Sequence, residues 1–352
     1  MHIFIDESGS FNPAGEMPSP SVVGALVLPD HNLADIERRY AKLRPKIWRK
    51  TGEVKGRELS EASVATVLDL LRRGGALLEV VVIEMGMHSP ERLKAHQADL
   101  AVKLTKNLTP EHHENAHKWV GTLRDELEAM KLPGFVQSTM NFELLRSVFE
   151  NASNYYAQRV PKEVGQYVWV VDGKEPLVDA TPWEKWWTTV MLPYLQGQSL
   201  SRPGLFLAEA DWTHYARFEL EAIPEYLVPH VKPDGRNKKG SDIRKVFEDI
   251  RFSSDPEPGL ELADIVTNAL RRALVGNLGR EGWIGIRDLM IARKEQSINM
   301  VSLNGFEPPP PLPYYDVLKE FKGHGRPFFA PRFREPNDPL PTFKPHLLKA
   351  RE

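Results

Sequence analysis

The sequence contains no cysteine among its 352 residues. Disulfide bonds, thiolate metal sites and cysteine nucleophiles are therefore excluded. The absence of cysteine also fits a reducing compartment, and we expect a cytoplasmic protein.

Long apolar runs and a strong net charge are absent as well. No stretch approaches the roughly 20 apolar residues that a membrane helix needs, and residues 1–6 lack the pattern of a signal peptide. The 46 Lys and Arg residues nearly balance the 48 Asp and Glu residues, which gives a formal net charge of -2. Any nucleic-acid site must therefore be a local basic patch rather than a property of the whole surface.

Strand-like and helix-like patterns alternate along the chain. Short β-branched or continuously apolar runs predict strands at 2–6, 21–28, 77–83, 166–171 and 204–208, with a last short one within 246–253. Apolar residues at helical spacing predict helices at 32–50, capped by Asn32, and at 60–71, 182–195 and 260–275. This alternation predicts an α/β fold, with helices flanking a sheet.

Two long segments do not fit a simple alternation. Residues 86–160 are helical in pattern but too long for a single crossover, so we interpret them as a helical insertion within a domain at 1–303. From residue 304 prolines become frequent and periodicity vanishes. This composition predicts a Pro-rich C-terminal extension at 304–352, extended or disordered, that is able to strap along the body.

Two of the predicted strands end on an aspartate. Asp6 follows the first strand and precedes Glu7-Ser8-Gly9, and Asp172 follows the strand at 166–171. Ligands of α/β sheets bind at the carboxyl ends of strands, where these acids can bind a cation. Turn aspartates give the same pattern, since Asp-Gly is a common turn dipeptide.

Asp264 lies in an otherwise mostly apolar helix. A charge in such a setting is costly unless it is paired or bound to a metal. Helical spacing places Leu260, Asp264 and Thr267 on one face, which indicates partial burial. The alternative to a functional role is an ion pair with Arg271 or Arg272.

Four motifs follow one another in a familiar order. They are IFIDESG at 3–9, EVKG at 53–56, VVD at 170–172 and LELADIV at 260–266. In this order they resemble the bacterial and phage family known as "domain of unknown function 3800", which is assigned to the ribonuclease-H-like superfamily. The resemblance covers residues 3–266 and implies a ribonuclease-H-like mixed sheet with an acidic metal centre at its strand tips.

The resemblance also implies a set of metal ligands, namely Asp6, Glu7, Glu53, Asp172 and Asp264. Glu58 is an alternative to Glu53. The sequence departs from the family pattern at Glu261, where a glutamine is expected, and at Lys174. Glu261 would add another acid near the site.

Several carboxylates from distant segments suit Mg²⁺ or Mn²⁺, which prefer oxygen ligands. Two such ions can stabilise both the attacking and the leaving oxygen of a phosphoryl transfer. We therefore expect a metal-dependent nuclease with Asp6, Glu53, Asp172 and Asp264 as catalytic residues. Without metal, their crowding should raise at least one carboxylate pKa. The alternative is a degenerate site that binds nucleic acid or a partner without cutting.

Positive side chains are expected to contact the phosphates of such a substrate. Lys55 is adjacent to the candidate ligand Glu53, and the densest basic loop contains Arg236, Lys238 and Lys239. A solvated surface loop would have the same composition. The sequence does not distinguish DNA from RNA, and it leaves the oligomeric state open.

A competing motif occurs in the helical insertion. His113, Glu114 and His117 form an H-E-x-x-H pattern, in which two histidines one turn apart bind Zn²⁺ and the glutamate activates water. With Glu143 as a third ligand, this would be a zinc peptidase. Residues 108–120 are polar on nearly every side, however, which favours a solvated helix.

Overall fold

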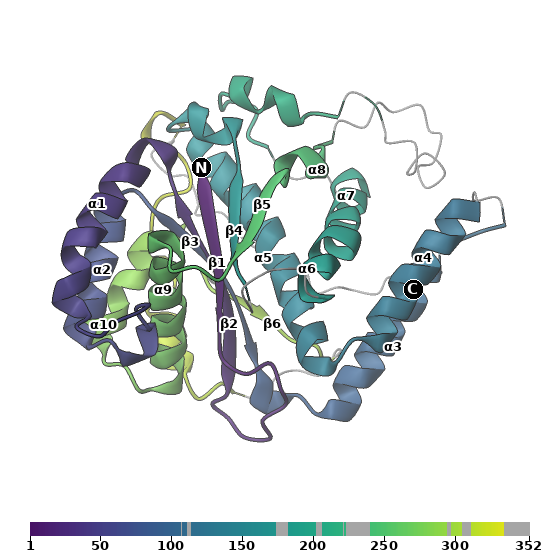
Figure 1. Cartoon of the computed structure of the whole chain (residues 1–352), viewed down its shortest axis with the longest axis horizontal. Coiled ribbons are helices and arrows are strands. Elements are labelled where there is room, and N and C mark those ends of the chain that lie inside the picture. Colours follow the sequence, from purple (N-terminus) through teal and green to yellow (C-terminus); the bar gives the residue numbers. More distant parts are fainter. Residues whose placement is uncertain are drawn as a thin grey trace.

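A mixed six-stranded sheet forms the centre of the protein (Figure 1). This computed structural model describes residues 1–106, 108–110, 114–173, 182–201, 206–220, 222, 240–293, 297–304 and 311–333. The strands are β1 (His2–Ser8), β2 (Pro20–Leu28), β3 (Leu77–Glu84), β4 (Val168–Asp172), β5 (Asp249–Ser253) and β6 (Asn299–Val301). They are arranged in the order β5-β4-β1-β2-β3-β6.

The strand directions determine at which edge of the sheet the carboxyl ends of the strands lie. β2 is antiparallel to both of its neighbours, β1 and β3, whereas β4 is parallel to β1 and to β5. Strand β6 is parallel to β3. The carboxyl ends of β1, β4 and β5 therefore meet at one edge of the sheet, where ligand sites form in α/β proteins.

Helices cover both faces of the sheet (Figure 1). One face is covered by α1 (Asp30–Ile47), α2 (Glu61–Arg73), α9 (Pro258–Val275) and α10 (Arg280–Trp283), followed by η7 (Ile284–Leu289). The other carries α5 (Leu132–Ala157), η3 (Pro161–Gly165), α6 (Pro182–Trp186), the π-helical turn η4 (Trp187–Met191), α7 (Leu192–Ser201), η5 (Thr213–Phe218) and α8 (Ile243–Val246). Two hydrophobic cores result, and alternation along β1 sends Phe4 into the first core and Ile3 and Ile5 into the second.

A glycine in the central sheet allows α9 to pack closely. A Cβ at Gly24 would lie 2.3 Å from Oγ1 of Thr267, so a larger residue in β2 would push α9 away. Because α9 carries Asp264, this close packing helps to set the height of that side chain above the sheet.

The helical stretch between β3 and β4 contains η2 (Met85–Met87), α3 (Pro90–Thr105), α4 (Glu114–Ala129) and α5. Helix α5 packs directly on β2 and β3 and belongs to the body of the protein. Helices α3 and α4 pack on each other and project away from the sheet (Figure 1). Across the described ranges, no helix is both long enough and apolar enough to span a membrane.

Several local expectations differ from the structure. Asn32 does not cap the first helix, because α1 already begins at Asp30 after Pro29, and the Asn32 side chain instead donates to the Gly74 carbonyl at 3.0 Å. The expected strand at 204–208 is not formed over 206–208, the part of it that the structure describes. Strand β6 was not predicted, because a three-residue strand carries too little periodic signal.

Part of the C-terminal extension lies on the body of the protein. Residues 311–333 include α11 (Tyr315–Lys319) and η8 (Pro331–Phe333), and they bury the side chains of Tyr314, Phe321 and Ala330. Tyr314 and Phe321 join the core beside α9. These residues therefore contribute to the core despite their proline-rich surroundings.

The apolar run of β3 contains one charged residue, and the structure buries it with a partner. The Glu79 side chain is only 4% exposed. Its carboxylate accepts hydrogen bonds from Nη2 of Arg293 at 3.1 and 3.0 Å and from Oγ of Ser147 at 2.7 Å. The sequence pattern gave no sign of this pair, because Glu79 and Arg293 are far apart along the chain.

Candidate functional site

The pairing of β1 with β4 places two of the expected ligands next to each other. The register aligns Phe4 with Val170, and both side chains pack into the core beside α9. Side chains two residues further along a strand lie on the same face. Asp6 and Asp172 therefore lie side by side at the carboxyl ends of neighbouring strands, on the side that faces α9.

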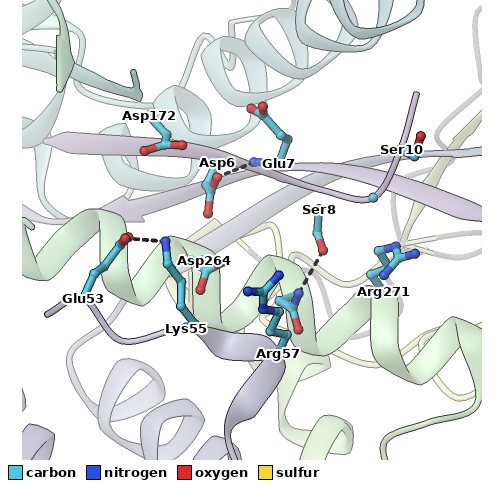
Figure 2. Close-up of a pocket in the computed structure, with 12 residues that line it drawn as sticks. Asp6, Glu7, Ser8, Ser10, Glu53, Lys55, Arg57, Asp172, Asp264 and Arg271 are labelled. Carbon is cyan, nitrogen blue, oxygen red and sulfur yellow. Dashed lines mark hydrogen bonds and ion pairs between the residues drawn. The ribbon is translucent and has the colours of Figure 1, made fainter. Parts of the chain in front are cut away.

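Glu7 lies on the opposite face of β1. Strand alternation groups it with Ile3 and Ile5 rather than with Asp6. Figure 2 shows its carboxylate pointing away from Asp264, while the Asp6 carboxylate points toward it. Asp6 is buried, and its Oδ1 accepts a hydrogen bond from the Glu7 backbone N–H at 2.7 Å.

Asp264 reaches the same region from α9. Its Oδ2 accepts a hydrogen bond from the Gly56 backbone N–H at 2.6 Å. A Cβ at Gly56 would lie 2.8 Å from the Ile265 Cα, so only glycine allows this segment to lie directly on the helix. The glycine of the EVKG motif thus joins the segment at 53–57 to the Asp264 carboxylate.

The arginines considered as partners of Asp264 bind elsewhere. Arg272 donates to the carbonyls of Gly56 and Leu59, at 3.1 and 2.9 Å. Arg271 donates through Nε to the Pro20 carbonyl at 3.1 Å. Within the described residues, neither arginine of α9 therefore forms an ion pair with the Asp264 carboxylate.

Glu261 is not an acid of this site, so the expectation that it adds one is wrong. Its side chain is 2% exposed and turns toward α1. It accepts hydrogen bonds from the Tyr40 hydroxyl at 2.9 Å, from Nε and Nη2 of Arg44 at 2.8 and 2.7 Å, and from the Val54 N–H at 3.0 Å. Burial alone would raise the pKa of Glu261, but these donors, Arg44 foremost, lower it. Glu261 therefore anchors the segment that carries Glu53.

All five expected ligands line a single cleft of about 550 Å³ (Figure 2). The residues that line it are Asp6, Glu7, Ser8, Gly9, Ser10, Glu53, Lys55, Arg57, Asp172, Asp264, Asn268 and Arg271. Glu58 is not among them, because it forms an ion pair with Lys50 at the surface. Of the two early glutamates, Glu53 is therefore the one that the cleft contains.

Lys55 is the cation closest to the acids. Its ammonium group forms an ion pair with Glu53 (Figure 2). Burial lowers the pKa of Lys55, but this pairing and the charges of Asp264 and Asp172 outweigh burial and raise it. In the part of the chain that the structure describes, no three His, Asp or Glu side chains are arranged to hold a metal ion.

Two carboxylates of the cleft are harder to ionise than usual. Burial, followed by repulsion from Glu53, raises the pKa of Asp172 to about 6, with a smaller contribution from Asp264. Burial also raises the pKa of Asp264, although the Gly56 N–H and Lys55 oppose the shift. The expectation of a raised carboxylate pKa is confirmed, but burial is a larger cause than crowding.

The raised pKa of Asp172 predicts a pH-dependent stability. In the unfolded chain the carboxyl ionises near pH 4, and in the folded protein it ionises near pH 6, so folding is penalised as the pH rises through this interval. In EDTA, Asp172→Asn should therefore stabilise the protein at pH 7.5 by about 1–2 kcal/mol after allowance for partial exposure. The gain should vanish at pH 3.5.

Urea denaturation at the two pH values measures this effect. Asp316→Asn is a suitable control, because that side chain is 95% exposed. An equal gain for Asp172→Asn at both pH values would show that the carboxyl does not titrate abnormally.

Six lining residues were not among the predicted site residues, namely Ser8, Gly9, Ser10, Arg57, Asn268 and Arg271. Asn268 and Arg271 follow Asp264 by four and seven positions on α9, so the helical period places all three on one face. That spacing was a usable signal. The position of Ser10 and Arg57 depends on how two loops meet, which periodicity does not describe.

Other expected residues do not enter this cleft. Arg236, Lys238, Lys239, Lys174 and His113 lie outside the described residues. Within the H-E-x-x-H motif, the exposed Glu114 forms an ion pair with Lys118 at 2.6 Å. His117 is exposed, and its Nε2 lies 3.0 Å from the Thr109 carbonyl. The expected third ligand, Glu143, pairs with Arg146 of its own helix at 3.0 Å.

Comparison with known proteins identifies no relative of this chain. No family model, curated protein or solved structure matches the chain. The chemistry of the cleft is therefore argued from its own residues.

Proposed function

We propose that this protein is a metal-dependent nuclease that hydrolyses phosphodiester bonds of nucleic acid with Mg²⁺ or Mn²⁺. The observation that carries the proposal is the shared cleft, to which β1, β4, the segment at 53–57 and α9 each contribute a carboxylate. Partly buried like charges repel one another, so such a group is unfavourable unless a cation or a substrate compensates it.

The donor set fits a hard divalent cation. The acids supply carboxylate oxygens, the ligands that Mg²⁺ and Mn²⁺ prefer. Burial, more than mutual repulsion, raises the pKa of Asp172 and of Asp264, and a bound cation would compensate the cost of ionising these carboxyls. Asp6, Asp172 and Asp264 would hold the metal, and Glu53 would join them by exchanging its ion pair with Lys55.

Each group then has a distinct task. Bound metal would supply the positive charge that stabilises the attacking and leaving oxygens of phosphoryl transfer. Lys55, once released from Glu53, is placed to contact a phosphate of the substrate. The Gly56 N–H orients the Asp264 carboxylate, and the register of β1 and β4 orients Asp6 and Asp172.

The fold supports the same proposal. A mixed sheet with acids at adjacent strand ends, covered by a helix that supplies a further acid, is what the resemblance to the "domain of unknown function 3800" family implies. We propose a ribonuclease-H-like assignment on that basis. Fold alone does not establish activity, which depends on the site.

A cleavage assay tests the proposed activity. Metal-stripped protein should cut a labelled strand from a panel of single- and double-stranded DNA and RNA after addition of Mn²⁺ or Mg²⁺, and EDTA should stop the reaction. Asp6→Asn, purified in the same way, should lose this cleavage, whereas Asp316→Asn should keep it. Cleavage that survives in Asp6→Asn would indicate a contaminating nuclease and remove support for the proposal.

One observation favours a second candidate function. Lys55 already neutralises Glu53, and the described acids do not form a ready three-ligand group. This arrangement would also suit a protein that binds nucleic acid without cutting it. Stable binding in Mn²⁺ without turnover on any member of the panel would favour this candidate.

A further inference from the structure

The cleft has a second half that carries no acid. Beyond the acidic residues it is lined by Ser8, Gly9, Ser10, Arg57, Asn268 and Arg271. Of these, Figure 2 labels Ser8, Ser10, Arg57 and Arg271, which lie toward the carboxyl-terminal part of α9 and the end of β1, away from Glu53 and Asp172. Two arginines and several neutral polar groups make this half complementary to an anion.

Arg271 is held in place and retains donors for a ligand. Its Nε donates to the Pro20 carbonyl at 3.1 Å, the one hydrogen bond of its guanidinium within the described residues. The two Nη groups therefore remain for an anion. Gly9 adopts a φ of +120°, and a Cβ there would lie 3.0 Å from Nε of Arg271 and 2.8 Å from Oγ of Ser21. Glycine at this position keeps the end of β1 close to the arginine.

Asn268 supplies an independent sign of a ligand. The side chain is 8% exposed, and its Nδ2 donates to Oγ of Ser8 at 3.1 Å, but its buried Oδ1 has no partner among the described residues. Turning the amide over preserves the contact, with the Ser8 hydroxyl as donor, and presents Nδ2–H to the cleft. A buried amide with unused hydrogen-bonding capacity on a cleft wall is expected where a ligand completes the network.

Arg57 lines the same cleft from a different element. It belongs to η1 (Gly56–Glu58), which is fixed to α9 by Gly56, and its own side chain is exposed. The two arginines thus come from different elements that pack together, and both line the cleft where an anion would bind. Guanidinium groups match phosphate oxygens through paired N–H donors.

We propose that Arg57, Arg271 and the Asn268–Ser8 pair form a subsite for the phosphate that adjoins the scissile one on the same nucleic-acid strand. The subsite rests on the proposed function, because its ligand is defined relative to the acidic half of the cleft. It commits the protein to a substrate with at least two successive phosphates, a polynucleotide rather than a mononucleotide.

Binding of a labelled oligonucleotide separates this inference from the activity. The full-length protein is titrated by fluorescence anisotropy in Ca²⁺ at several salt concentrations, with wild type, Arg57→Gln, Arg271→Gln and the control Arg73→Gln, which lies on α2 and pairs with Asp69. Each cleft variant should weaken binding about tenfold and reduce the slope of log K against log salt by about one. Arg73→Gln should change neither quantity, and Arg271→Lys should recover part of the affinity.

The outcomes distinguish the two proposals. Weaker binding and a reduced salt slope in Arg57→Gln and Arg271→Gln support the subsite, even if no metal yields cleavage by the wild type. If both variants bind like Arg73→Gln, the subsite is overturned, whereas metal-dependent cleavage lost in Asp6→Asn would still support the nuclease. If Arg271→Gln fails to fold, the exposed Arg57 alone decides the result.

Discussion

Replacement of Asp264 by asparagine is expected to reduce turnover at least about 10³-fold, because it removes a charged ligand on which transition-state stabilisation depends. Asparagine preserves the shape of the side chain, and its Oδ1 can still accept the hydrogen bond from the Gly56 N–H. The loss should therefore appear in kcat, with little change in nucleic-acid binding.

The same variant should be at least as stable as the wild type when metal is absent. Burial raises the pKa of Asp264, so the ionised carboxylate is unfavourable in the folded protein, and a neutral amide avoids this penalty. Thermal denaturation in EDTA and in Mn²⁺ measures both effects, and the stabilisation by Mn²⁺ should be smaller in Asp264→Asn than in wild type.

Two results would contradict this account. Wild-type turnover in Asp264→Asn would exclude Asp264 as a metal ligand. A large loss of stability in EDTA would instead assign the aspartate a structural role through its contact with Gly56. Asp316→Asn again serves as the control for the general effect of removing a surface charge.

The second large effect is expected at a buried ion pair that does not line the cleft. Glu79→Gln should lower the free energy of unfolding by about 3–5 kcal/mol, because it removes the negative charge of Glu79 from its buried ion pair with the Arg293 guanidinium. The side chains of Glu79 and Arg293 are only 4% and 5% exposed, so water cannot replace the lost charge. Urea denaturation measures the change.

A surface pair provides the matched control. Glu320→Gln removes the partner of Arg280, whose side chain is 59% exposed, and should cost less than about 1 kcal/mol. If Glu79→Gln is as mild as Glu320→Gln, the buried pair does not stabilise the fold as described. Joint replacement of Glu79 and Arg293 by apolar residues should recover much of the loss, since no charge then remains unpaired.

Local sequence signals were sufficient for most regular elements. Side-chain alternation and apolar runs predicted β1 to β4, and helical spacing predicted α9, because these patterns arise from interactions between residues close in the chain. The helix predicted at 60–71 is α2, and Ser60 caps it, with its side chain accepting a hydrogen bond from the Ser63 N–H. Asn32 shows the limit of such signals, since its side chain bonds to Gly74 instead.

The candidate site required a different kind of information. Sequence placed Asp6 and Asp172 at strand ends and Asp264 on a partly buried helix face, but only the β1–β4 register and the packing of α9 bring them to one cleft. The same packing assigned Glu53 rather than Glu58 to the cleft.

The sequence by itself identified the candidate carboxylates, because residue type, strand ends and helical period are local properties. Tertiary structure decided which way each acid faces. Glu261 is an acid in the same motif as Asp264, yet four hydrogen bonds from Tyr40, Arg44 and Val54 hold its carboxylate toward α1, outside the cleft. The ion pair between Glu79 and Arg293 likewise forms only in the folded protein, because the two residues are far apart in the sequence. Which groups become partners depends on contacts between segments that are distant in the sequence. These contacts form, and contribute to the free energy, only when the chain folds.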